Sequence, residues 1–420
     1  MPDLLGLSAR IIDSGDTSER VNRVTGELSE LGDGLAMVEA FSHVVAFRTD
    51  EGLVLFDTSV EGFGPVVRDR LTAWSGGERV HTIVYTHGHV DHVGGASALV
   101  DAATQVVAHE NVPVRFDRYD LTNGYNAAIN KRQFGRDMLQ FFADWVRPTL
   151  VYETVLDVSV GGLDMTLHHG RGETDDHTWT WIPSLRAVCA GDFLIWAFPN
   201  AGNPQKVQRY PLEWAQAMRA MAALSPELYL PAHGLPIAGA ARIASVLDDV
   251  ATALEGLVRD TLEMMNAGAR LDEIVAAVRV PSSLLEKPYL RPTYDEPEFV
   301  VRNIWRLYGG WWDGRADTLK PARPAAVAAE LAALAGGARR LADRALALAA
   351  AGDDASLRLA CHLVELAADA ATDASEASEV HAARAHVYDT RRATELSLMS
   401  RGIYKAAADD SREISLQSDR

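Results

Sequence analysis

The chain has 420 residues, of which 48% are hydrophobic and 23% charged, so we expect a folded protein of two or more domains rather than a disordered one. Its formal net charge of −18 repels phosphate backbones and anionic membrane surfaces, which argues against nucleic-acid and membrane partners. The chain does not begin with a basic stretch and a long apolar run, and it has no run of eighteen apolar residues, so we expect a cytoplasmic protein without membrane insertion.

The first half of the chain alternates short β-branched runs with glycine-rich turns. The predicted elements are a hairpin of strands over 41–47 and 53–56, a helix over 65–74, a strand over 80–86 and a second hairpin that turns near residue 161. This alternation of strands and helices is typical of an α/β fold, in which strand ends present side chains to solvent.

The second half is helical in pattern. Apolar residues recur at helical spacing from Val246 to Met265, and Gly268 follows as a plausible cap. The stretch 325–371 is rich in Ala and Leu with glycine interruptions, which predicts stacked helical hairpins. We therefore expect an α/β domain over residues 1–245 and an all-α domain over 246–420.

The strongest chemical signal is a histidine-rich stretch directly after the predicted strand 80–86. It contains His87, His89, Asp91 and His92. Imidazole and carboxylate groups are ligands for zinc-like ions, and the alternation lets His87 and His89 share one face while Asp91 and His92 turn toward a second ion. The alternative is a polar loop that satisfies its own backbone.

A metal site needs more ligands than one loop can supply. Three further segments carry candidates directly after other predicted strands: Glu173 with His177, Asp192, and His233. The sequence therefore predicts that several strand-end loops meet around a metal.

In these motifs, His-x-His-x-Asp-His, then Gly191-Asp192, then Pro-Ala-His233-Gly, the chain resembles the metallo-β-lactamase superfamily. The resemblance implies an αββα sandwich and two zinc ions, or other divalent metals, per chain. It also implies that His87 and His89 hold the first metal, that Asp192 bridges, and that the second metal is held by Asp91, His92 and His233.

The last ligand of the first metal is open between two residues. Most superfamily members have a histidine where this chain has Glu173, and the alkylsulfatase branch has a glutamate there. We favour Glu173, because a carboxylate binds zinc well, and assign the competing His177 to a supporting or substrate-contacting role.

The resemblance to alkylsulfatases extends beyond this position. The stretch from Asn126 to Arg132 and the Arg209-Tyr-Pro-Leu motif look like segments of that branch, and the helical half looks like its dimerisation domain, which implies a homodimer. Cationic and amide donors are needed for an anionic head group, so Arg132, Arg209, Asn126 and Asn203 are candidate substrate contacts.

The expected function is hydrolysis of a small anionic ester, with an alkyl sulfate favoured. A metal-bound hydroxide would attack, and Asp91 would orient it besides binding metal. The rival enzymatic interpretation is a hydrolase of a lactone, thioester or phosphoester with the same metals. A non-hydrolytic alternative is a metal-dependent redox or binding protein.

Overall fold

The computed structural model describes residues 3–135, 140–142 and 144–418. The chain divides into two compact units, Met1–Gly124 with Gln140–Trp311 (unit 1), and Tyr125–Leu139 with Trp312–Arg420 (unit 2). The predicted division after residue 245 falls inside helix α7 (Ala240–Asn266), within unit 1. That division stays a prediction about domains, since the compact units divide elsewhere.

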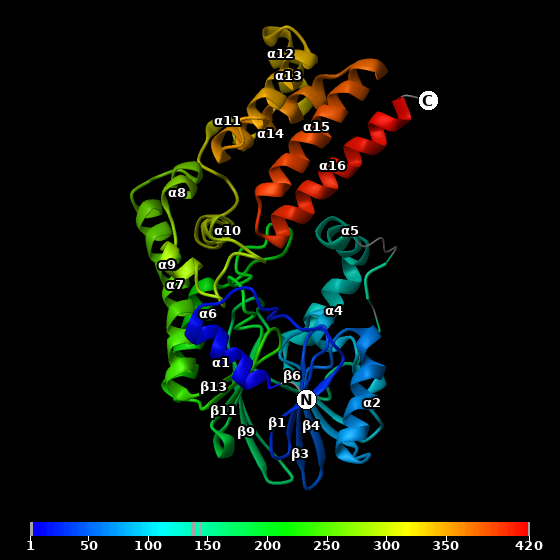
Figure 1. Cartoon of the computed structure of the whole chain (residues 1–420), viewed down its shortest axis with the longest axis vertical. Helices are drawn as coiled ribbons and strands as arrows, with labels where there is room; N and C mark the ends of the chain where they lie inside the picture. The colour runs from blue at the N-terminus through cyan, green and yellow to red at the C-terminus, as the bar shows by residue number, and fades with distance from the viewer. Residues whose placement is uncertain (1–2, 136–139, 143, 419–420) are drawn as a thin grey trace. The chain divides into compact units, whose positions relative to one another are not determined.

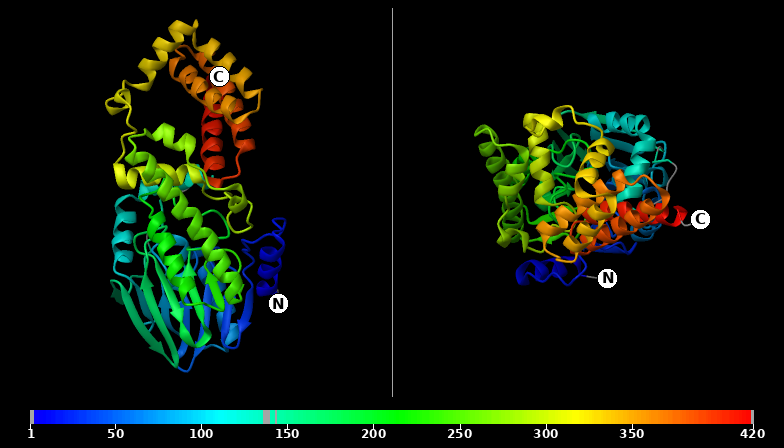
Figure 2. Two further views of the ribbon diagram at one scale, coloured as in Figure 1. Left: turned by 90° about the vertical axis from the view of Figure 1, so that its left-hand side faces the viewer. Right: turned by 90° about the horizontal axis from the view of Figure 1, so that it is seen from above.

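Unit 1 contains two β-sheets in the described part of the chain (Figures 1 and 2). The seven strands of the first sheet, in spatial order, are β1 (Leu28–Gly32), β2 (Leu35–Val38), β3 (Val44–Thr49), β4 (Gly52–Phe56), β5 (Val80–Val84), β6 (Gln105–His109) and β7 (Leu150–Tyr152). The six strands of the second are β13 (Ile237–Ala238), β12 (Leu228–Pro231), β11 (Ala187–Gly191), β10 (Thr178–Ile182), β9 (Leu163–His169) and β8 (Val155–Val160).

Strand β4 shows how the layers are stacked. Because successive side chains point to opposite faces, Val54 and Phe56 enter a core shared with the second sheet, whereas Leu53 and Leu55 enter a core under helices α2 and α4. The helices of unit 1 are α1 (Leu4–Ser14), α2 (Gly64–Ser75), α3 (Val90–Val93), α4 (Asn111–Leu121), α6 (Pro211–Ala223), α7, α8 (Leu271–Ala277), α9 (Ser282–Leu285) and α10 (Pro297–Gly309). The predicted order of helix, sheet, sheet and helix layers is confirmed.

Unit 2 is helical over its described residues. It contains most of α5 (Asn123–Phe134) together with α11 (Ala316–Leu319), α12 (Pro324–Ala335), α13 (Ala338–Ala349), α14 (Asp354–Ala370), α15 (Ala374–Thr394) and α16 (Leu398–Ser418). Asp353 and Asp373 cap α14 and α15 by accepting backbone N–H groups of their first turns, which satisfies donors that a helix start leaves free. The predicted helical hairpins over 325–371 are confirmed as α12, α13 and α14.

Among the described residues, no helix combines the length and the apolar composition that crossing a membrane would need. The carboxyl ends of strands β5, β11 and β12 are followed by the predicted ligands His87, Asp192 and His233.

Candidate metal centre

The candidate ligands gather where parallel strands end. Strands β4 and β5 run parallel, and the chain leaves β5 to reach His87 almost at once. Strands β11 and β12 also run parallel, and Asp192 and His233 follow them. Because parallel strands have their carboxyl ends at one edge, this topology brings loops from distant parts of the sequence together.

The distances between ligand atoms show that this convergence occurs. His92 Nε2 lies 3.4 Å from Asp192 Oδ2 and 3.6 Å from Asp91 Oδ2. His233 Nε2 lies 3.3 Å from Asp91 Oδ2 and 3.7 Å from Asp192 Oδ1. Atoms bound about 2.0–2.1 Å from a tetrahedral zinc lie roughly 3.4 Å apart, so these spacings suit groups that share a cation.

The ligand atoms form two overlapping groups among the described residues. The first joins His87, His92 and Asp192, and the second joins Asp91, His92 and His233, each with atoms within 4.8 Å of one another. Although these atoms are close, the His92 Nε2 and Asp192 Oδ1 atoms are buried without a hydrogen bond in the described part of the chain. The donor set and its unsatisfied atoms therefore fit divalent metal.

Burial and mutual charge set the protonation of the cluster. Burial lowers the pKa of His87 well below its usual value, which favours the neutral imidazole that a metal requires. Burial alone would raise the pKa of Asp192, but the neighbouring His92 and His233 lower it. Burial raises the pKa of Glu173. Imidazole lone pairs and carboxylates buried together in this way are what a bound cation would stabilise.

The two alternatives for the last ligand have different surroundings. Glu173 Oε1 lies 3.5 Å from His89 Nδ1 and also accepts a hydrogen bond from Asn200 Nδ2 at 2.5 Å. His177 Nε2 accepts the Asp192 backbone N–H at 3.2 Å, and its ring stacks on Phe193 with 4.3 Å between centroids. Glu173 thus borders the ligand cluster, whereas His177 supports the backbone beneath Asp192.

The candidate substrate contacts fall into both units. Arg209 is 1% exposed, and its Nη2 atom lies 3.5 Å from Glu173 Oε1. Asn203 is buried in the same loop and accepts the Gln205 N–H at 3.0 Å. Asn126 and Arg132 lie on α5 in unit 2, so their place at the centre stays a prediction.

Sequence analysis did not identify Asp57, which follows β4 directly. Its Oδ2 atom lies 2.7 Å from His92 Nδ1, and its Oδ1 atom accepts the Thr86 N–H at 2.7 Å. This hydrogen bond orients His92 with Nε2 toward the other ligands, as partners of metal-binding histidines do. The sequence feature that could have identified Asp57 is a carboxylate directly after the apolar run of β4, which is buried throughout.

Tyr294 was also missed. Burial raises the pKa of its hydroxyl group, and the charges of Glu173, Asp91 and Asp192 raise it further. The side chain therefore lies near the carboxylates of the candidate ligand cluster. Nothing in its proline-rich sequence context indicates this position.

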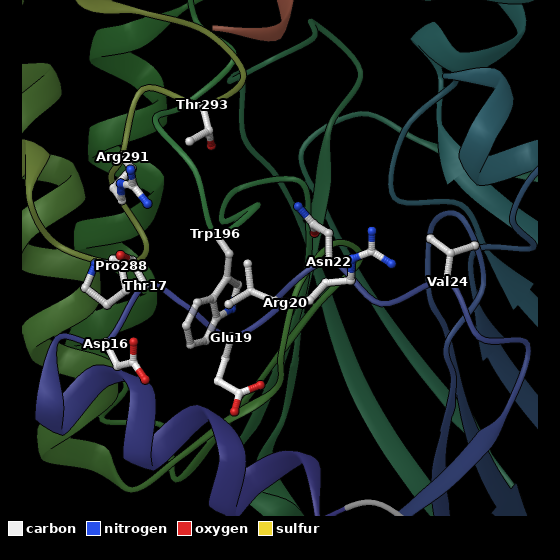
Figure 3. Close-up of a pocket in the computed structure, with 11 residues that line it drawn as sticks. Asp16, Thr17, Glu19, Arg20, Asn22, Val24, Trp196, Pro288, Arg291 and Thr293 are labelled. Carbon is white, nitrogen blue, oxygen red and sulfur yellow. The ribbon is translucent and has the colours of Figure 1, made fainter. Parts of the chain in front are cut away.

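A cavity of about 630 Å³ lies in unit 1 beside Trp196, which follows Asp192 on the same loop (Figure 3). The Trp196 Nε1–H donates to Leu235 O at 2.8 Å, so the ring is fixed next to the loop of His233. Figure 3 shows Arg20 and Arg291 on different sides of this ring. The two guanidinium groups do not converge on one ligand, and we assign the cavity no function.

Two family models match the chain. The model of the metallo-beta-lactamase superfamily matches residues 38–233, and the alkyl sulfatase dimerisation model matches residues 270–413. Together they cover both the candidate ligands of unit 1 and most of the described helices of unit 2.

Curated relatives point the same way. A linear primary-alkylsulfatase of a Pseudomonas strain is 27% identical over 331 residues, covering 72% of this chain and 61% of the relative. An (R)-specific secondary-alkylsulfatase of Pseudomonas is 24% identical, covering 67% of this chain and 48% of the relative. The chain thus spans about half to three-fifths of the length of these relatives.

A solved structure shares the fold. The stereoselective inverting sec-alkylsulfatase Pisa1 of Pseudomonas superposes with a TM-score of 0.82 at 22% identity, covering 92% of this chain and 65% of that chain. The expected α/β fold with a following helical region is therefore confirmed.

Proposed function

We propose that the chain is a metal-dependent hydrolase of small anionic esters, with alkyl sulfates as the favoured substrates. The matches to the metallo-beta-lactamase superfamily model over residues 38–233 and to the alkyl sulfatase dimerisation model over residues 270–413 support this proposal. The single observation that carries this proposal is the meeting of His92, Asp192 and His233 at spacings of 3.4–3.7 Å. The names of the relatives favour the sulfate ester.

In this proposal two divalent ions, zinc in the first instance, are held by residues from four loops. His87, His89 and Glu173 would hold one ion, Asp91, His92 and His233 would hold the other, and Asp192 would be available to both. When bound, such ions lower the pKa of a water so that it is a nucleophile at neutral pH, and they polarise the ester oxygen.

The residues of the chain supply orientation and charge. Asp91 would orient the attacking water besides holding metal; its Oδ2 atom lies 3.6 Å from His92 Nε2 and 3.3 Å from His233 Nε2. Arg209 and Lys206 supply positive charge for the anionic head of the substrate, and burial lowers the pKa of Lys206 to about 8. Asn203, Asn126 and Arg132 remain further candidates for contact with substrate. His177 is assigned to supporting Asp192 rather than to substrate, because its Nε2 atom accepts the Asp192 backbone N–H.

The first experiment measures metal content and turnover of the purified protein. We expect about two divalent ions per chain by elemental analysis, and loss of activity on chelation that returns with zinc. His87→Ala is expected to lower the metal content while the protein remains folded. His81→Ala is the matched control. His81 lies near the start of β5, the strand that precedes His87, and is close to Glu51 rather than to the ligands. Full turnover after complete metal removal would refute the proposal.

The second experiment tests the substrate class. Alkyl sulfates, phosphate esters, lactones and thioesters are compared at equal concentration with the metal-loaded protein. We expect the highest kcat/KM for an alkyl sulfate. A preference for a lactone or thioester would replace the substrate while leaving the metal centre in place.

A further inference from the structure

Gly88 lies between the two predicted ligands His87 and His89, and its backbone is held from outside the loop. The Gly88 N–H donates to Asp176 Oδ2 at 3.1 Å. Gly88 and Asp176 are both buried. A single carboxylate therefore fixes the backbone N–H between His87 and His89.

The approach at this point is too close for a side chain on the loop. A Cβ atom at Gly88 would lie 2.9 Å from Arg115 Cδ and 3.0 Å from Asp176 Oδ2. The glycine in the His-Gly-His motif is thus explained by contact with these two side chains rather than by backbone conformation, since its φ is not positive.

Asp176 is itself fixed by Arg115 of α4. The Arg115 Nε–H donates to Asp176 Oδ2 at 2.6 Å, and both side chains are at most 2% exposed. Arg115 also pairs with the neighbouring Asp175, whose side chain is 38% exposed. Charge-assisted hydrogen bonds are the strong ones, so this buried pair connects α4 to the loop through Asp176.

The segment from Glu173 to His177 therefore reaches the ligand cluster three times. Glu173 borders His89, Asp176 holds Gly88, and His177 holds the amide of Asp192. Sequence analysis gave a role to the first and the last of these residues only.

We propose that Asp176 is a positioning residue for the first metal, which fixes the orientation of His87 and His89 through the Gly88 amide without binding the ion. The proposal rests on the proposed metal centre. Residues that orient metal ligands typically change metal affinity about 10- to 100-fold when they are replaced.

The test compares Asp176→Asn with Asp175→Asn. Asparagine keeps the shape of the side chain but removes the negative charge that pairs with Arg115, and its amide oxygen is a weaker acceptor for the Gly88 N–H. We expect Asp176→Asn to bind zinc at the first site roughly 10- to 100-fold less tightly in chelator competition, and to change the visible spectrum of the cobalt-loaded protein. Asp175→Asn removes the other partner of Arg115. We expect its zinc affinity to stay within about threefold of that of the unchanged protein, and its cobalt spectrum to be the same.

Equal zinc affinity in Asp176→Asn and the unchanged protein would overturn the inference, as would an equal loss in both variants. If Asp176→Asn does not fold, Gly88→Ala decides, because the added methyl group presses on the same contact from the loop. An unchanged zinc affinity in Gly88→Ala would then refute the role of this contact. If neither the unchanged protein nor any variant binds zinc, the proposed function and this inference are both overturned. If His87→Ala loses zinc but Asp176→Asn and Gly88→Ala do not, the proposed function stands and only this inference is refuted.

Discussion

Asp57 is held in a backbone conformation that few non-glycine residues adopt. Its φ is +61°, and that of Ser59 is +63°. Such conformations persist where the surrounding structure holds them, often next to functional sites. Here the conformation places one carboxylate against both His92 Nδ1 and the Thr86 backbone.

We expect Asp57→Asn to weaken binding of the second metal, for which His92 is a proposed ligand, by roughly 10- to 100-fold. The replaced oxygen no longer fixes which nitrogen of His92 carries the proton, so Nε2 is less available as a ligand. Chelator competition with the purified protein measures the loss. Asp69→Asn is the control, because Asp69 is exposed and pairs only with its neighbour Arg68 in the described part of the chain. An affinity equal to that of the control would contradict the role of Asp57.

The ligand residues and the residues that support them differ in how far sequence could predict them. His87, His89, Asp91 and His92 share one short motif, so residue types and spacing sufficed to predict that they gather. Asp176 lies next to Asp175 in the sequence, and only the fold separates the buried residue from the half-exposed one. Contacts across 88 positions, as between Gly88 and Asp176, leave no local pattern.

At the scale of elements, the loop from Phe193 to Tyr210 is long and irregular, yet it is buried along much of its length. Several contacts fix it, among them two that join it to other segments of unit 1. Asn200 donates to Glu173, and the Gly202 N–H donates at 2.7 Å to Asp295 Oδ2, just before α10. A Cβ at Gly202 would lie 2.2 Å from the Phe299 backbone, so the loop lies directly against the start of this helix.

We expect Asp295→Ala to lower the free energy of unfolding by about 1–3 kcal/mol, because the buried Gly202 N–H loses its acceptor. Asp295→Asn retains an oxygen in the same place and is expected to lose less. Urea unfolding at neutral pH, followed by circular dichroism, measures both. Equal stability of the alanine variant and the unchanged protein would show that the loop is held by other contacts.

Most predicted elements of unit 1 are confirmed, with shifted ends. The strand predicted over 41–47 begins only at Val44, because the His43 N–H bonds to Ala232 O at 2.7 Å instead of to a neighbouring strand. The helix predicted over 65–74 is α2, Gly64–Ser75, and the second hairpin turns at Gly161 and Gly162 between β8 and β9. Local patterns predict an element, while long-range hydrogen bonds decide where it ends.

At the scale of the whole molecule, helix α7 explains why the predicted division and the compact units differ. The pattern of the sequence changes near its start, which suggested a new domain. However, Val246, Val250 and Leu254 belong to the same core as the two sheets. An amphipathic helix shows which of its faces is apolar but not which surface covers that face.

The family match of unit 2 and its surface together lead to a prediction about assembly. Helix α12 buries Ala328 and Ala332, but Val327, Leu331 and Leu334 lie on another face and are 42%, 40% and 84% exposed. Fully burying one large apolar side chain gains about 1.5–3 kcal/mol relative to leaving it in water. We therefore expect a second copy of the chain to cover this row in a two-fold dimer. We expect a dimer at micromolar concentration in sedimentation velocity and a monomer for Leu334→Glu, whereas Leu185→Glu, which changes an equally apolar residue in a turn of unit 1, remains dimeric. A dimer that persists in Leu331→Glu/Leu334→Glu would place the interface on another face of the molecule.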